Sequence, residues 1–200
     1  MATYRTSLVP DRRGAALAAA LWLGFIVVLL AWHRPPLCPC GTVHFWAGEV
    51  QSAENSQQLT DWYSFSHLIH GMIFYGAAHL LWRKCGLDRW LAGPLWALPL
   101  AVLIEGGWEL LENSPVIIDR YRAVTMSYGY SGDSVLNSAS DIACMVLGFL
   151  FAARVPARVT VATALAFELF TLAMIRDNLT LNVLMLAWPI DAIRHWQSAA

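Results

Sequence analysis

Long runs of apolar residues alternate with short polar stretches along most of this chain. A helix that crosses a bilayer needs about 20 mostly apolar residues, because the hydrocarbon core is about 30 Å thick and an α-helix rises about 1.5 Å per residue. Apolar runs predict spanning helices at 14–32, 63–82, 90–111, 134–153, 159–175 and 179–195. The pattern therefore predicts one all-α membrane domain, residues 1–200, built as a bundle of about six transmembrane helices.

The first and last of these segments each have a second interpretation. Segment 14–32 follows Arg12 and Arg13, and a secretory signal peptide also begins with basic residues. Its apolar run is long for a signal peptide and no small-x-small cleavage site follows it, so we favour an uncleaved anchor. Segment 179–195 has a short apolar run and is either a tilted span or a half-span packed against its neighbours.

The composition of the chain agrees with a membrane protein. Hydrophobic residues make up 58% of the chain and charged residues 14%, whereas about a quarter of a soluble domain is charged. The ten tryptophans and six tyrosines suit two water–lipid boundaries, because amphipathic rings settle at the level of the headgroups. A net charge of −1 argues against a nucleic-acid partner, which calls for a clustered basic surface. Membrane lipids are therefore the expected partners.

The distribution of Lys and Arg predicts the orientation of the bundle. With six alternating spans and a cytoplasmic N-terminus, nine of the 13 Lys and Arg residues lie inside and the other four outside. Cytoplasmic loops carry the excess of these residues. We therefore expect a bacterial inner-membrane protein with both termini in the cytoplasm and outer loops at 33–62 and 112–133. Aromatic residues such as Phe45, Tyr121 and Tyr128 favour ordered loops.

Ionisable residues within the predicted spans gather near the outer ends of the helices. Side chains three or four positions apart share one face of a helix. Two histidines and two carboxylates on such faces have the ligand types of zinc, manganese or iron sites: His67, His70, Glu105 and Glu109. Three acids at the same level are candidate catalytic groups: Glu112, Asp133 and Asp141. We predict an outward-facing pocket; the alternative is a buried polar network that joins the helices.

The second outer loop adds two arginines, Arg120 and Arg122. A guanidinium group matches the geometry of a phosphate. Together with Asn113 and Asn137, these arginines are candidate substrate-binding residues, and a cation opposite them would suit a lipid or lipid-linked substrate. The alternative is that both arginines are solvated and pair with Asp119 or with lipid headgroups.

Cys38 and Cys40 lie in the first outer loop, with His33 and His44 nearby. Thiolate and imidazole ligands together suit zinc or copper, so this pair is a candidate second metal site or a redox site. The alternatives are a turn held by other parts of the loop, or two free thiols. A disulfide across a single intervening residue would be strained.

Six sequence strings resemble an uncharacterised family of bacterial multi-pass inner-membrane proteins, a domain of unknown function in the uncharacterised-protein-family class. The strings are CPCG at 38–41, SAENSQQLTD at 52–61, YSFSHLIHG at 63–71, ELLENS at 109–114, DRYR at 119–122 and GDSVLNSASD at 132–141. The resemblance covers nearly the whole chain and implies an inner-membrane location without an established activity. A looser similarity to VanZ-like proteins involves Glu109, Arg120, Asp141 and Gly148.

Two functional hypotheses follow from these residues. The first is an outward-facing membrane enzyme, a metal-dependent hydrolase or transferase, that acts on a lipid or lipid-linked envelope substrate. The second is a non-enzymatic binding, transport or assembly factor of the envelope, in which the acids carry protons or bind a partner. Both hypotheses require His67, Glu105 and Asp141 to lie close together.

Overall fold

The computed structural model describes residues 8–127 and 129–198 of the chain. In this part of the chain, eight α-helices follow one another: α1 (Arg12–Ala31), α2 (Ser64–Arg83), α3 (Gly93–Glu112), α4 (Pro115–Val124), α5 (Val135–Arg154), α6 (Ala157–Ile175), α7 (Leu179–Ala187) and α8 (Asp191–Ser198). A short 3₁₀ helix, η1 (Leu87–Arg89), connects α2 to α3, and the two-residue strands β1 (Trp46–Ala47) and β2 (Thr60–Asp61) pair in parallel. The predicted all-α architecture is confirmed. Arg5 and Tyr128 lie outside the described residues.

Polar side chains determine where four of the helices begin. The first N–H groups of a helix have no partner within it, and a side-chain oxygen at the preceding residue can accept from one of them. Asp11 accepts from the backbone at the start of α1 at 2.7 Å, and Ser134 does so at the start of α5 at 3.1 Å. Ser114 and Asn178 cap α4 and α7 in the same way. The cap at Ser134 orients the first turns of α5, which carry Asn137 and Asp141.

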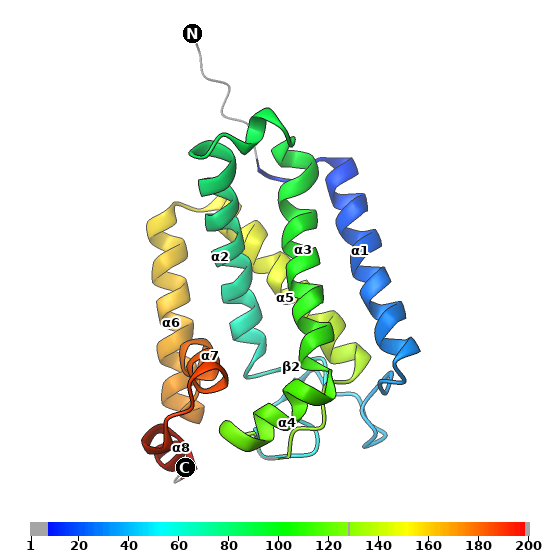
Figure 1. The fold of residues 1–200 in the computed structure, drawn as a ribbon, viewed down its shortest axis with the longest axis vertical. Helices are drawn as coiled ribbons and strands as arrows, with labels where there is room; N and C mark the ends of the chain where they lie inside the picture. Colours follow the sequence, from blue (N-terminus) through cyan, green and yellow to red (C-terminus); the bar gives the residue numbers. More distant parts are fainter. Residues whose placement is uncertain (1–7, 128, 199–200) are drawn as a thin grey trace.

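Five long helices run along the bundle in alternating directions: α1, α2, α3, α5 and α6 (Figure 1). Helix α2 packs most extensively against α5, and α1 against α3. The short helices α4, α7 and α8 gather at the lower end in Figure 1, together with the connections that follow α1 and α3. One end of the bundle therefore carries most of the irregular structure.

Four helices within the described residues are long and apolar enough to cross a membrane: α1, α3, α5 and α6. Helix α2 has the same length, 20 residues, but its three histidines and two serines make it more polar. The sixth predicted span, 179–195, is corrected by the structure. It divides into α7 and α8, of 9 and 8 residues, and helices this short do not cross a core about 30 Å thick.

The C-terminal helix α8 lies at the end of the bundle opposite to the start of α1 (Figure 1). Gln197 donates to Asp177 at 3.1 Å, and Asp177 accepts from the Tyr63 hydroxyl at 3.2 Å, next to the start of α2. At the other end, the Asp11 N–H donates to the Pro94 carbonyl at 3.1 Å. The start of α1 and helix α8 therefore lie at opposite ends of the bundle, because five long helices separate them rather than six; the cytoplasmic location of both termini stays a prediction.

Two glycines allow α2 and α5 to approach closely. A Cβ atom at Gly71 would lie 1.9 Å from the Met145 carbonyl oxygen, and one at Gly148 would lie 2.0 Å from the Leu68 carbonyl oxygen. Small residues permit this kind of backbone contact between membrane helices. The contact holds the histidines of α2 beside the carboxylate of Asp141 on α5.

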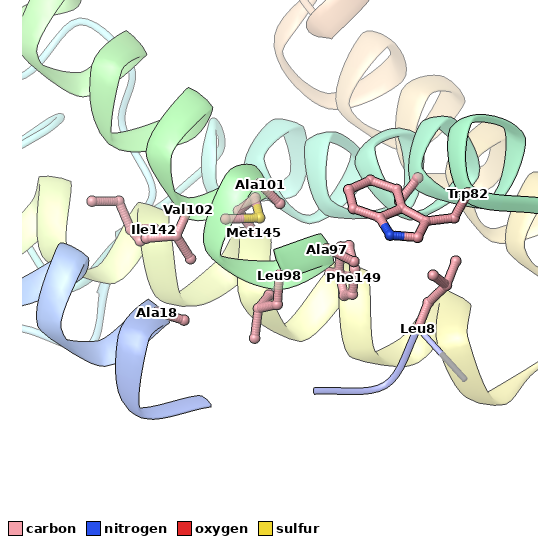
Figure 2. Close-up of a cluster of buried hydrophobic side chains, with 11 residues drawn as sticks. Leu8, Ala18, Trp82, Ala97, Leu98, Ala101, Val102, Ile142, Met145 and Phe149 are labelled. Atoms are coloured by element: carbon pink, nitrogen blue, oxygen red, sulfur yellow. The ribbon is translucent and has the colours of Figure 1, made fainter. Parts of the chain in front are cut away.

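An apolar cluster fills the bundle at the end where α1 begins. The members labelled in Figure 2 come from the residues before α1 and from α1, α2, α3 and α5: Leu8, Ala18, Trp82, Ala97, Leu98, Ala101, Val102, Ile142, Met145 and Phe149. The polar atom of Trp82 is satisfied, because its indole N–H donates to the Leu91 carbonyl at 2.8 Å. The buried polar side chains lie beyond this cluster, toward the opposite end of the bundle.

Reporter fusions test the arrangement of the two chain ends. Alkaline phosphatase is active only outside the cytoplasm, whereas green fluorescent protein fluoresces only inside it. We expect fusions of these reporters before α1 and after α8 to report opposite sides of the membrane. Fusions at the two positions that report the same side would contradict five crossings.

The contact between α2 and α5 can be tested with Gly71→Val. The added side chain meets the Met145 backbone, so we expect the variant to lose about 1–3 kcal/mol of stability through overpacking. The thermal unfolding midpoint in detergent measures this loss. Gly76→Val is the matched control on the same helix, because nothing lies within 4 Å of a Cβ atom there. Equal losses in the two variants would argue against a tight contact at Gly71.

Candidate functional site

A cavity of about 260 Å³ lies between the helices at the end where α4 and α7 gather. Its polar wall combines carboxylate, imidazole and amide side chains from five segments: Asp61, His67, His70, Glu105, Glu112, Asp133, Asn137, Asp141 and Asn182. Its apolar wall is formed by side chains of α2, α3 and α7: Phe74, Ile104, Trp108, Leu179 and Val183. Residues of the predicted stripes of α2, α3 and α5 therefore meet in one chamber, and Glu109 of the α3 stripe lies behind the residues that line it.

His67 on α2 occupies the centre of the polar wall and is 6% exposed. Its Nδ1 lies 2.6 Å from Oε1 of Glu105 on α3, and its Nε2 lies 3.8 Å from Oδ2 of Asp141 on α5. His70, one turn further along α2, places its Nδ1 at 3.0 Å and 3.1 Å from the two oxygens of Glu105. A single imidazole thus connects carboxylates of two other helices.

Glu109 is 1% exposed, and neither of its carboxylate oxygens has a hydrogen-bond partner among the described residues. The nearest ring nitrogen, Nδ1 of His67, is 3.6 Å from Oε1 and already contacts Glu105 at 2.6 Å. A buried carboxylate without partners is strongly unfavourable. The Glu109 oxygens therefore require a compensating positive charge or proton.

Three overlapping sets of side chains have the spacing needed to hold a metal ion. They are His67 with His70 and Glu105; His67 with Glu109 and Asp141; and Glu109 with Glu112 and Asp133. Within each set the ligand atoms lie within 4.8 Å of one another. All four predicted metal ligands and all three predicted catalytic acids belong to these sets, and combined imidazole and carboxylate ligands suit zinc, manganese or iron.

Asp133, just before α5, is held by several neighbours. Its two carboxylate oxygens accept from the Tyr130 hydroxyl at 2.9 Å and from the Asn113 amide at 2.8 Å. Its backbone N–H donates to Asn113 at 2.8 Å, and its carbonyl accepts from Arg34 at 2.7 Å. Burial raises the pKa of Asp133 to about 6. Asn113, predicted to bind substrate, instead positions this carboxylate and does not line the cavity.

The two arginines of α4 correct another prediction, because neither lines the cavity. Arg120 donates to the Leu186 carbonyl at 3.0 and 2.9 Å, which joins α4 to α7. Arg122 donates to the Tyr130 carbonyl at 2.5 Å and lies 3.7 Å from Asp119. Among the described residues that line the cavity there is neither Lys nor Arg. The expected anion-binding wall is therefore absent from this chamber.

Several cavity residues were not predicted because they lie in loops and short helices. Asp61 accepts from the backbone N–H groups of Ser56 and Tyr63 at 3.0 and 2.8 Å, and burial raises its pKa. Tyr121 and Tyr130 also line the cavity. Burial raises the pKa of both hydroxyls, and nearby carboxylates add to the effect. The only signal in the sequence was the polar and aromatic content of the two outer loops.

Glu168 on α6 has a structural role and does not line the cavity. Its carboxylate accepts from the N–H groups of Leu179 and Thr180 at 2.9 and 3.1 Å. These are orphan donors in the first turn of α7. The acid thus stabilises the start of a short helix, which explains its position within an apolar segment.

Cys38 and Cys40 form a disulfide in this structure. Metal ligation uses the thiolate, and in the oxidised pair each sulfur is bonded to the other. A second metal site at these residues therefore remains a prediction for the reduced pair only.

A family model described as "Protein of unknown function (DUF2585)" matches residues 29–199, which include every residue of the cavity wall. The chain belongs to this family. Relatives named UPF0314 protein occur in Novosphingobium aromaticivorans, 64% identical over 95% of both chains, and in Sphingopyxis alaskensis, 59% identical over 94% of this chain and 96% of the relative. Another, from Paracoccus denitrificans, is 50% identical over 91% of this chain and 94% of its own. No solved structure matches the chain.

The predicted resemblance to an uncharacterised family is thus confirmed by a DUF2585 match over most of the chain. The names of its UPF0314 relatives assign no activity. The similarity to VanZ-like proteins stays a prediction. Function must therefore be argued from the cavity itself.

The packing around the cavity gives a pH test at Asp177, which holds the cavity residue Tyr63. Burial raises the pKa of Asp177 from 3.8 to about 6. Stability that this residue contributes below pH 4 is therefore lost as the pH rises through about 6. We expect Asp177→Asn to gain stability over the wild type between pH 4 and pH 7, by at most about 3 kcal/mol. Thermal unfolding midpoints measured across that range check this, and a difference that does not change with pH would contradict it.

Proposed function

We propose that this protein is a metal-dependent membrane enzyme, a hydrolase or transferase, that acts on a lipid or lipid-linked substrate at the outer face of the bacterial inner membrane. The observation that carries the proposal is the carboxylate of Glu109, which is buried without a hydrogen-bond partner between two sets of ligand residues. A divalent cation at this position supplies the missing positive charge. It would also polarise a substrate oxygen or activate a water molecule.

The balance of charge around the cavity supports a bound cation. Six carboxyl groups meet two histidines there: Asp61, Glu105, Glu109, Glu112, Asp133 and Asp141. If all six were ionised and both imidazoles protonated, six negative charges less two positive would leave four. Uncompensated charge at membrane depth is costly. Cations or bound protons are needed to keep this cluster together.

The apolar wall supports a substrate with a hydrocarbon part. Ile104 on α3 and Val183 on α7 line the cavity and are 57% and 53% exposed. Phe74 and Trp108 complete this wall. An acyl or polyprenyl chain could lie against these side chains from the lipid while the polar part of the molecule reaches the histidines.

Two features favour an outward-facing cavity in a bacterial inner membrane. With α8 at the cavity end, seven of the 12 Lys and Arg residues in the described part of the chain lie at the end where α1 begins and five at the cavity end. The richer end is expected in the cytoplasm. The disulfide between Cys38 and Cys40 also lies in the connection at the cavity end, and disulfides persist in oxidising compartments.

Elemental analysis of detergent-purified protein tests the proposal. We expect near-stoichiometric zinc, manganese or iron in the wild type and at least about tenfold weaker retention in Glu109→Gln, which keeps the shape of the side chain but removes its charge. Glu49→Gln is the matched control, because Glu49 is exposed in the first outer loop.

Thermal unfolding provides a second measurement on the same variants. Metal at 100 times its dissociation constant should stabilise the wild type and Glu49→Gln by about 2.7 kcal/mol, with a much smaller gain in Glu109→Gln. The proposal fails if folded wild-type protein, supplied with each of the three metals, neither retains nor is stabilised by any of them.

A second candidate function is a non-enzymatic transport, binding or assembly factor of the envelope. The absence of Lys and Arg from the described cavity lining favours it, because a phosphorylated headgroup would find no cationic side chain there. In this case cations or protons are the cargo of the acidic chamber. Metal uptake into proteoliposomes that depends on Glu109 would favour this role over catalysis.

A further inference from the structure

We propose that the cavity holds two divalent cations, bridged by the carboxylate of Glu109. The inference rests on the metal dependence proposed above and extends it from one ion to two. The first position is defined by His67, Asp141 and Glu109, and the second by Glu112, Asp133 and Glu109.

Glu109 is the one residue that these two positions share. Both of its oxygens are buried and lack a hydrogen-bond partner in the described structure, so each oxygen is available to a different ion. In proteins with two metal ions at one site the ions lie about 3.5–4 Å apart, a separation that the two oxygens of one carboxylate can bridge. A single ion would leave the second set of ligands without a cation.

The first position has the supporting contacts of a histidine–carboxylate metal site. Metal-binding histidines commonly donate their other ring nitrogen to a carboxylate, which fixes the tautomer and the ring orientation. His67 places Nδ1 at 2.6 Å from Glu105 and turns Nε2 toward Asp141 at 3.8 Å. Ser64 donates to the other oxygen of Asp141 at 3.2 Å. Glu105 is therefore inferred to position His67, rather than to bind the ion as the sequence predicted.

The second position consists of carboxylates that are also held in place. Asp133 accepts from Tyr130 at 2.9 Å and from Asn113 at 2.8 Å, which leaves further lone pairs on both oxygens. Glu112 lines the same cavity as Tyr121 and Asp133. An all-carboxylate set suits magnesium or manganese, whereas imidazole in the first position also suits zinc or iron. Manganese is compatible with both positions.

The charge of the ligands agrees with two ions. The four carboxylates of the two positions are Glu109, Glu112, Asp133 and Asp141. One divalent cation leaves two of their four negative charges uncompensated, and two cations leave none. Two adjacent cations would also bind an oxyanion, such as the phosphate of a lipid, without an arginine in the cavity wall.

Manganese titration of metal-free wild-type protein tests the inference. Protein stripped with a chelator is loaded with Mn²⁺, passed through a desalting column and analysed for bound metal, and its electron paramagnetic resonance spectrum is recorded. We expect two ions per chain and the multiline spectrum of an exchange-coupled pair.

Asp141→Asn and Asp133→Asn each remove one ligand set, so each should bind one ion and lose the coupled spectrum, while Glu49→Gln should keep both. A wild type that saturates at one ion, or variants that both keep two, would overturn the inference. A wild type that binds one ion would overturn two-ion binding and leave the proposed metal dependence standing, whereas a wild type that binds none of the three metals would overturn both. If a variant does not fold, the stoichiometry and spectrum of the wild type decide the question.

Discussion

The contact between His67 and Glu105, at 2.6 Å in the interior of the bundle, is the interaction on which the organisation of the site depends. It joins α2 to α3, and the second nitrogen of the same ring faces α5. Buried ionisable groups are tolerated only where partners surround them. The three helices must therefore keep their relative positions along the bundle axis. The glycine contacts fix the position of α2 relative to α5.

The two ends of the bundle have different physical roles. The end where α1 begins is filled with alanine, leucine and aromatic side chains that stabilise the packing of four helices. The cavity end instead contains a high density of buried carboxylates, amides and tyrosines. Most of these polar groups form hydrogen bonds with one another. The carboxylate of Glu109 is an exception, and this exception is the main support for a bound cation.

The sequence predicted the core of the site but assigned some residues wrongly. His67, Glu105, Glu109 and Asp141 follow helical periodicity within apolar segments, so their meeting could be predicted from spacing and depth. Arg120 could not be placed in this way, because its contact with Leu186 depends on how α4 packs against α7. Loop residues such as Asp61 and Tyr130 follow no helical periodicity, so the sequence does not indicate where their side chains point.

The amino-acid sequence by itself determined the all-α membrane architecture, the bounds of the long helices and the level at which the acids gather. These features depend on local hydropathy and helical geometry, which act within a single segment. Tertiary structure alone decided that the last predicted span is two short helices, α7 and α8, that the arginines turn away from the cavity, and that Glu109 has no hydrogen-bond partner among the described residues. Each of these features depends on contacts between segments that are distant in the chain. The local pattern of apolar and polar residues does not indicate which side chain pairs with which buried group.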